Sequence, residues 1–130
     1  MPHILFVDDD PWFTQLYGSS FVTHESYDTS FAHSASEALK LCSSDQLVDL
    51  IVLDMHMPGH NGIELLHELA SYDDLNTIAV ILLSSAFEHE FKMSPERWRQ
   101  YGVVEFLYKP TTKPDDLLNH VKKHFARIAV

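Results

Sequence analysis

The chain has 130 residues, with nine Lys plus Arg against nineteen Asp plus Glu and a formal net charge of −10 at pH 7. This length predicts one domain, residues 1–130, which can bury roughly two thirds of its unfolded surface without a disulfide or a structural metal. The acidic balance argues against direct binding to nucleic acid or to an anionic membrane.

Cysteine content and hydropathy limit the class of protein and its expected location in the cell. Cys42 is the only cysteine, which excludes a disulfide framework and a thiolate metal site. No apolar run approaches the ~20 residues of a membrane span, and the N-terminus lacks a signal-peptide pattern. We therefore expect a cytoplasmic location and no association with a membrane.

The first third of the chain predicts a strand, a helix, an edge strand and a second helix. Residues 3–7 are apolar and read as a strand, and Asp10 with Pro11 predicts the cap and first turn of a helix. Residues 27–33 alternate between polar and apolar side chains, which is typical of a strand near a sheet edge. Ser34 and Glu37 form a capping-box pattern before a helix that places Cys42 in the core. The apolar stripe of the first helix comprises Phe13, Leu16, Tyr17 and Phe21.

The middle of the chain contains a continuous apolar run that ends on a carboxylate. Residues 48–53 predict a strand buried on both faces, as in a parallel sheet, and Asp54 ends it. The Met57-Pro58-Gly59 stretch cannot continue a strand. A helix over residues 62–71 follows, with Leu65, Leu66 and Leu69 facing inward. Taken alone, Asp54 is better explained as an ordinary strand-end or turn residue.

The last third predicts two more strands and two helices. Residues 77–83 form an apolar strand that ends at Ser84, and residues 94–101 form a capped helix that Gly102 stops. Residues 103–107 form the fifth strand, which leads into Lys109. The final helix is expected to bury Leu117, Leu118, Val121, Phe125 and Ile128.

Five strands that alternate with five helices predict an α/β fold. The expected architecture is a flavodoxin-like, doubly wound (βα)5 fold with a five-stranded parallel sheet in the order 2-1-3-4-5. Parallel strands place their carboxyl ends on one edge of the sheet. Four of the five strands deliver a polar group at that edge: Asp8 and Asp9, Asp54, Ser84, and Lys109.

These groups predict a site for a cation and a phosphoryl group. Three adjacent carboxylates repel one another unless a cation intervenes, and a hard divalent ion such as Mg²⁺ (or Mn²⁺) prefers oxygen ligands. Lys109 and Ser84 would pair with phosphoryl oxygens, and a carboxylate can accept a phosphoryl group as nucleophile. Asp54 stands alone on its strand and is the natural acceptor. Spacing alone leaves the choice among Asp8, Asp9 and Asp54 open.

Four motifs stand in order along the chain: ILFVDDDP (Ile4–Pro11), IVLDMHMPGHNG (Ile51–Gly62), ILLSS (Ile81–Ser85) and FLYKP (Phe106–Pro110). Together they resemble the receiver domain of bacterial two-component response regulators of the chemotaxis-regulator type. The resemblance covers essentially the whole chain.

The resemblance assigns a role to each matching position. It implies phosphorylation of Asp54, direct Mg²⁺ ligation by Asp9 and Asp54 with Asp8 acting through water, and a backbone carbonyl ligand from His56. Ser84 would be the switch hydroxyl, Phe106 the aromatic switch residue and Lys109 the lysine that pairs with the phosphate. The Lys109–Pro110 peptide would be cis.

The implied function is that of a signalling switch rather than a turnover enzyme. A sensor histidine kinase or phosphotransfer protein would donate the phosphoryl group to Asp54, and a downstream protein would read the altered surface. Slow hydrolysis would reset it, and a phosphorylation-dependent dimer is compatible with this scheme. Residues 87–101 depart from the family pattern, so the resemblance does not imply which downstream protein binds the altered surface.

Two alternatives and one metal hypothesis stand beside this interpretation. A pseudo-receiver would use the same fold as a phosphorylation-independent interaction module. A flavin-binding protein is disfavoured because clustered carboxylates repel a flavin phosphate. His120 and His124 are one helical turn apart and could hold a transition metal, but no acidic partner is evident, so surface histidines are expected. Trp12 and Trp98 are expected to pack rather than bind ligand.

Overall fold

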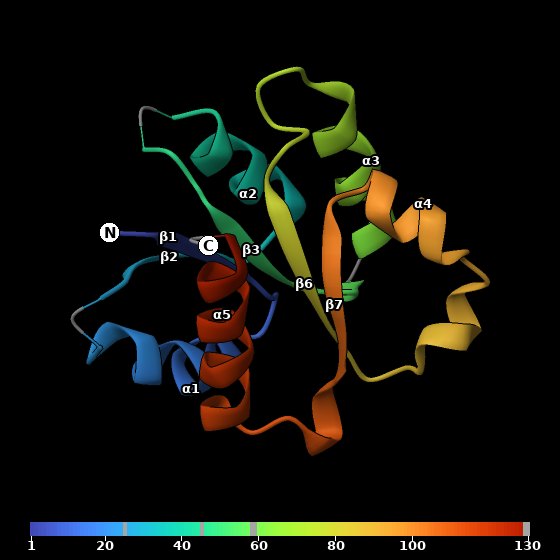
Figure 1. Cartoon of the computed structure of the whole chain (residues 1–130). Coiled ribbons are helices and arrows are strands. Elements are labelled where there is room, and N and C mark those ends of the chain that lie inside the picture. The colour runs from blue at the N-terminus through green and yellow to red at the C-terminus, as the bar shows by residue number, and fades with distance from the viewer. Residues whose placement is uncertain (25, 45, 58–59, 129–130) are drawn as a thin grey trace.

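Helices cover both faces of a five-stranded parallel sheet in the computed structural model, which describes residues 1–24, 26–44, 46–57 and 60–128 (Figure 1). The sheet order is β2-β1-β3-β6-β7, and each neighbouring pair is parallel. This confirms the predicted order 2-1-3-4-5. The strands are β1 (His3–Val7), β2 (Asp28–Ala32), β3 (Leu50–Asp54), β6 (Ala79–Ser84) and β7 (Val103–Tyr108).

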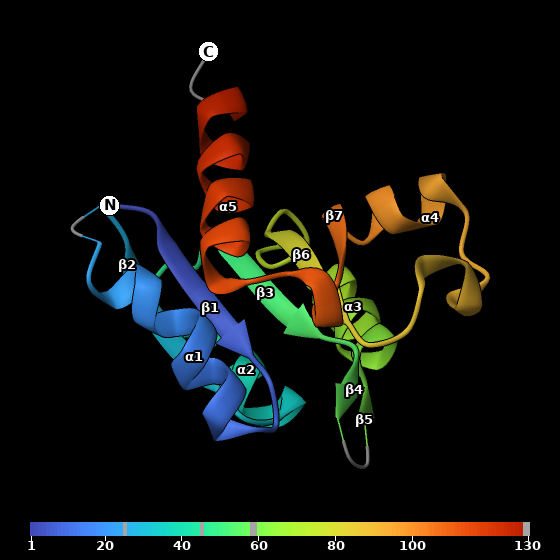
Figure 2. The ribbon, with the colours of Figure 1, turned by 90° about the horizontal axis from the view of Figure 1, so that it is seen from below.

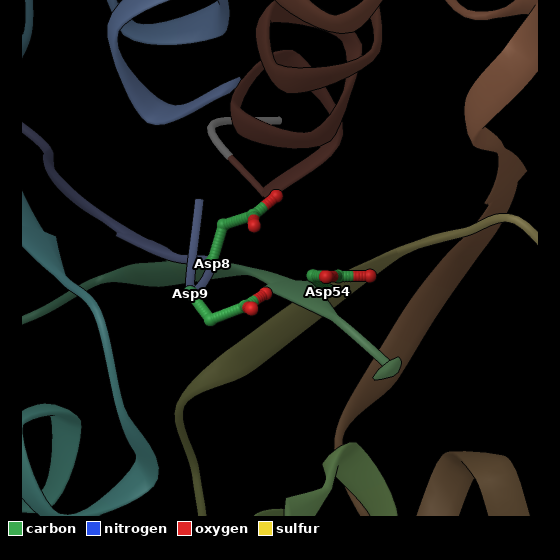
Figure 3. A group of neighbouring side chains, drawn as sticks. All are labelled: Asp8, Asp9 and Asp54. Atoms are coloured by element: carbon green, nitrogen blue, oxygen red, sulfur yellow. The ribbon is translucent and has the colours of Figure 1, made fainter. Parts of the chain in front are cut away.

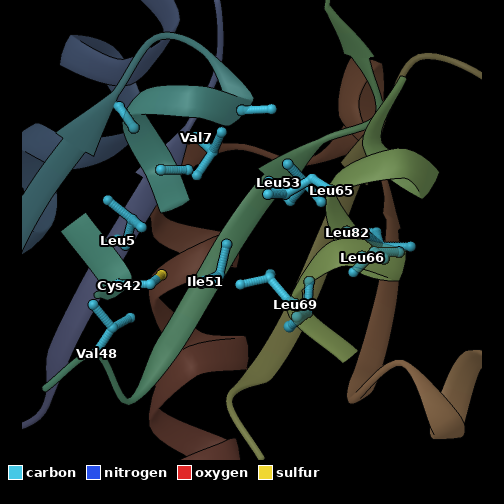
Figure 4. Packing of buried hydrophobic residues seen from close by; sticks show 14 of the residues in the cluster. Leu5, Val7, Cys42, Val48, Ile51, Leu53, Leu65, Leu66, Leu69 and Leu82 are labelled. Atoms are coloured by element: carbon cyan, nitrogen blue, oxygen red, sulfur yellow. The ribbon is translucent and has the colours of Figure 1, made fainter. Parts of the chain in front are cut away.

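The helices divide between two hydrophobic cores, one on each face of the sheet. Helices α1 and α5 pack on one face, whereas α2, α3 and α4 pack on the other (Figures 1 and 4). The α-helices are α1 (Pro11–Val22), α2 (Ala35–Cys42), α3 (Gly62–Ser71), α4 (Pro95–Gln100) and α5 (Pro114–Ile128). Two short 3₁₀ turns are η1 (Glu88–Phe91) and η2 (Lys109–Thr111).

Strand β3 is buried on both faces, which explains its uninterrupted apolar sequence. Ile51 and Leu53 enter the core beneath α2 and α3, and Leu50 and Val52 enter the core beneath α1 and α5. Alternate residues of a strand point to opposite faces, so a central strand needs apolar residues at every position. The exposed and half-buried residues of β2 fit its place at the sheet edge.

N-terminal caps fix where three helices begin and hence where the loops that precede them end. Asp10 Oδ1 accepts from the Trp12 backbone N–H at 2.9 Å, and Ser34 Oγ accepts from Glu37 at 3.1 Å. Ser94 caps α4 in the same way. Each such cap contributes about 1 kcal/mol. These contacts confirm three predicted helix starts, and the first of them starts α1 three residues after Asp8.

Four short elements of the structure were not predicted: the 3₁₀ turns η1 and η2, and two strands. Strands β4 (His56–Met57) and β5 (His60–Asn61) form a small antiparallel pair between Asp54 and α3. The predicted strand break includes Pro58 and Gly59, which lie outside the described residues. The backbone N–H of Gly62 donates to the carbonyl of Met55 at 2.9 Å and joins the two ends of the segment that holds β4 and β5.

Three smaller predictions are wrong. No cis peptide occurs in the described chain, so Lys109–Pro110 is trans; Pro110 lies in the first turn of η2, closed by a Thr112 N–H bond to the Lys109 carbonyl at 3.2 Å. Ile128 is 65% exposed because the last turn of α5 extends beyond the sheet (Figure 2). Trp12 is 62% exposed, whereas Trp98 is buried as expected. Within the described residues, every helix is too short or too polar to cross a membrane.

We expect Gly102→Ala to destabilise the protein by about 2 kcal/mol or more. Gly102 has φ of 78° and a Cβ there would lie 2.7 Å from the Ile78 carbonyl oxygen. Chemical denaturation would measure the loss, with the exposed Gln100→Ala as a control that leaves stability nearly unchanged. Equal stability of the two variants would contradict this explanation.

Candidate functional site

Three carboxylates converge at the carboxyl ends of β1 and β3. Asp8 and Asp9 directly follow β1, and Asp54 is the last residue of β3 (Figures 2 and 3). Each of the three residues offers an oxygen, and these oxygens all lie within 4.8 Å of one another. Asp8 and Asp54 are buried and Asp9 is half-buried. The predicted convergence of strand ends therefore occurs.

Lys109 lies buried within this cluster. Its Nζ donates to Asp8 Oδ2 at 2.8 Å and lies 3.7 Å from Asp54 Oδ2. Lys109 follows β7, so the ion pair connects the last strand of the sheet to β1 and β3. One cation among three carboxylates leaves an excess of negative charge in a region that little water reaches.

The excess negative charge is visible at Asp54. Burial, with the neighbouring Asp8, raises the pKa of Asp54 from 3.8 to about 6, even though Lys109 and the His56 N–H act in the opposite direction. Oxygen donors and unbalanced negative charge are the features that a hard divalent cation such as Mg²⁺ or Mn²⁺ prefers. Asp8, Asp9 and Asp54 thus fit the predicted cation site.

His56 lies next to the cluster through its backbone. Its N–H donates to Asp54 Oδ1 at 3.3 Å, and its imidazole, which is exposed, packs against Phe91 with ring centroids 5.8 Å apart. The peptide unit of His56 is therefore at the rim of the carboxylate cluster. Ligation of a cation by its carbonyl oxygen stays a prediction.

Ser84 and Phe106 lie on β6 and β7, as predicted. Asp54 of β3 is in register with Leu83, so Ser84 is one residue beyond Asp54 along the neighbouring strand. Ser84 is fully buried and its Oγ accepts from the Ala86 N–H at 3.0 Å. The half-buried ring of Phe106 packs against Phe91 and Trp98, with centroids 5.7 Å away in each case. Their switching roles stay predictions.

Two residues of α1 belong to the site although the sequence indicated only core positions for them. The ring centroid of Phe13 lies 3.9 Å from Lys109 Nζ, and the Tyr17 hydroxyl donates to the Thr112 carbonyl at 2.8 Å. The available signal was their spacing of one helical turn on a helix that begins directly after Asp8 and Asp9. Nothing in the sequence indicated that this face of α1 meets the lysine.

The histidine pair on α5 has an acidic neighbour. His120 Nδ1 lies 3.0 Å from Glu105 Oε1 of β7, a partner that the sequence did not reveal. Among the described residues, the only group of three or more potential ligands is Asp8, Asp9 and Asp54. That His120 and His124 are not metal ligands stays a prediction.

Comparison with known proteins identifies what the chain is similar to. The sequence model of the response regulator receiver domain matches residues 4–122. Transcriptional regulatory protein MalR of Bacillus subtilis is 32% identical over 110 residues, 85% of this chain and 45% of MalR. Two-component response regulator ORR3 of Oryza sativa is 32% identical over 119 residues, 89% of this chain and 85% of ORR3. The chain thus spans less than half of MalR.

A solved structure gives the same result. The response regulator protein TrrA of Thermotoga maritima, in complex with Mg²⁺ and beryllium fluoride, has 30% sequence identity and a TM-score of 0.71. The match covers 95% of this chain and 98% of that one. The similarity therefore includes the full set of strands that form the carboxylate cluster.

The raised pKa of Asp54 predicts a pH-dependent effect of Asp54→Asn on stability. A carboxyl whose pKa is higher in the folded state contributes most stability below its unfolded pKa, and this contribution is lost as the pH rises through about 6. In magnesium-free buffer near pH 7.5, Asp54→Asn should therefore be more stable than the wild type, by up to about 3 kcal/mol. The gain should shrink towards pH 4, as measured by denaturation at several pH values.

The exposed Asp10→Asn is the matched control, because asparagine also caps a helix. It should show little difference from the wild type at any pH. A stability gain for Asp54→Asn that does not depend on pH would rule out the raised pKa as its cause.

Proposed function

Because the chain belongs to the response regulator receiver domain family, we propose that it accepts a phosphoryl group on Asp54 and acts as a switch. The observation that carries this proposal is the convergence of Asp8, Asp9 and Asp54 around the ammonium of Lys109. The donor would be a phosphohistidine of a sensor histidine kinase or phosphotransfer protein. A downstream protein would read the result.

The hydrogen bonds of the cluster favour Asp54 over Asp8 as the acceptor. Both oxygens of Asp8 are engaged: Oδ1 accepts from the Asp10 N–H at 3.0 Å and Oδ2 from Lys109 at 2.8 Å. The contacts of Asp54 are longer, 3.3 Å to the His56 nitrogen and 3.7 Å to Lys109. A less engaged carboxylate oxygen is the better nucleophile, since fewer bonds must be released for attack.

The transfer itself is a single displacement at phosphorus. An Asp54 oxygen attacks, a P–O bond forms, and the P–N bond of the phosphohistidine breaks with its electron pair going to the imidazole nitrogen. Lys109 pairs with a phosphoryl oxygen, for which its distance of 3.7 Å from Asp54 Oδ2 is suitable. Asp8, Asp9 and Asp54 would hold Mg²⁺ or Mn²⁺, whose charge, when bound, offsets that of the phosphoryl oxygens.

The signal would leave the site through Ser84. Its hydroxyl now accepts from Ala86, and a phosphoryl group on Asp54 offers it an acceptor oxygen on the neighbouring strand. A shift of Ser84 and of the loop after β6 would release the packing of Phe106 against Phe91 and Trp98. The population of two surface conformations would then change, and a partner would bind one of them.

Incubation with acetyl phosphate and Mg²⁺, followed by intact mass measurement, tests the acceptor. We expect one phosphate adduct on the wild type and none on Asp54→Ala. Asp10→Asn should still form the adduct, because Asp10 is exposed and caps α1. If neither acetyl phosphate nor a phosphohistidine donor gives an adduct, the chain is a pseudo-receiver that binds partners without phosphorylation.

Trp98 offers a direct readout of the switch. Its ring packs against Phe106, and in a Trp12→Phe background it is the sole tryptophan. Beryllium fluoride with Mg²⁺ should change the Trp98 fluorescence in this background. The change should disappear when Ser84 is replaced by Ala, although the ligand still binds. An identical change with and without the Ser84 hydroxyl would show that Ser84 does not carry the signal.

A further inference from the structure

Helix α1 contacts both ends of Lys109. At the ammonium end, Nζ lies 3.9 Å from the centroid of the Phe13 ring. At the backbone end, the Tyr17 hydroxyl lies 3.4 Å from the Lys109 carbonyl oxygen and 2.8 Å from that of Thr112. Phe13 and Tyr17 are one helical turn apart, and their rings stack with centroids 6.3 Å apart and an interplanar angle of 16°.

We propose that Phe13 is a positioning residue that holds the Lys109 ammonium for the phosphoryl group, with Tyr17 as its anchor. This inference rests on the proposed function, in which Lys109 pairs with a phosphoryl oxygen on Asp54. Neither aromatic residue would touch the reacting atoms. Both act through the lysine.

The contacts of the ammonium explain why an aromatic ring suits this position. An ammonium has three N–H donors, and here Asp8 and Asp54 account for its two carboxylate neighbours. The face of Phe13 covers a further side with negative potential and offers no hydrogen-bond acceptor. The ring therefore stabilises the charge without competing with the phosphoryl oxygens for its protons.

A cation over a ring face can also shift sideways at little cost, because the attraction is not directed along a hydrogen bond. Lys109 is bonded to Asp8 at 2.8 Å and must turn towards Asp54 to meet the phosphoryl group. A carboxylate or amide in place of Phe13 would bind the ammonium in one position. The ring permits this movement and keeps water from one side of the charge.

Tyr17 restricts this movement to the side chain of Lys109, because it holds the backbone of that residue in place. Its hydroxyl contacts the backbone carbonyls of Lys109, the first residue of η2, and of Thr112, which directly follows η2. Tyr17 is buried, and burial raises its pKa, so the hydroxyl remains a proton donor. The Cα of Lys109 is thereby tied to α1 while its ammonium changes partner.

The test is the affinity for beryllium fluoride in the presence of Mg²⁺, measured by ¹⁹F NMR. Phe13→Leu keeps a similar apolar volume but removes the ring, and we expect affinity to fall by about fivefold. Affinity for Mg²⁺ alone should stay within about twofold, since the Phe13 ring offers no oxygen ligand to the cation. Trp12→Leu, on the same helix and exposed, is the matched control and should leave both affinities unchanged.

Fluorination of the Phe13 ring separates its electrostatic effect from simple packing. Successive fluorine substitutions weaken the negative potential of the ring face at almost constant size. Beryllium fluoride affinity should decrease stepwise along the series, whereas thermal stability should change little. Constant affinity along the series, or a higher affinity in Phe13→Leu, would overturn the inference.

The same experiment distinguishes this inference from the proposed function. If the wild type binds beryllium fluoride and all Phe13 variants bind it equally, only the positioning role fails. If the wild type neither binds beryllium fluoride nor forms an acetyl phosphate adduct, the phosphoacceptor function fails and the positioning role with it.

Discussion

Mutual repulsion among Asp8, Asp9 and Asp54 is the constraint on which the site depends. Their oxygens lie within 4.8 Å of one another, two of the three residues are buried, and Lys109 supplies one positive charge. Such a group is costly in a folded protein, because the charges repel at short range and little water screens them. Burial, with the neighbouring Asp8, raises the pKa of Asp54 to about 6. A site of this kind favours groups that supply positive charge, and this preference connects cation binding with the placement of Lys109.

The fold assembles this group from segments distant in the sequence. Parallel pairing of β1 with β3, of β3 with β6 and of β6 with β7 brings residues 8, 54, 84 and 109 to one edge, while two hydrophobic cores hold the strands in register. Each core residue of this kind contributes a few kcal/mol, which offsets the cost of the buried charges. The aromatic residues of α1 then contact Lys109 from the face of the sheet that α1 and α5 cover. Structural stability and the geometry of the site thus depend on the same packing.

The fold and the acidic cluster were predictable from the sequence because their signals are local. Uninterrupted apolar runs such as residues 48–53 identify central strands, and the strand ends then determine where Asp54 and Lys109 must lie. The β4–β5 pair was missed because two-residue strands have no periodicity. The burial of Ile128 was predicted wrongly because helical spacing does not reveal where the sheet beneath a helix ends. The contact of Phe13 with Lys109 joins residues 96 positions apart and depends on the helix packing angle, which no local pattern specifies.

The central claim is that burial, together with the excess negative charge of the cluster, raises the pKa of Asp54, and that a bound cation relieves this charge. The most direct measurement is a ¹³C NMR titration of the Asp54 carboxyl carbon with and without saturating Mg²⁺. The account predicts a pKa near 6 without the ion and a clear downward shift with it, since a nearby cation favours the ionised carboxylate. An ordinary pKa near 3.8 in both conditions would contradict it.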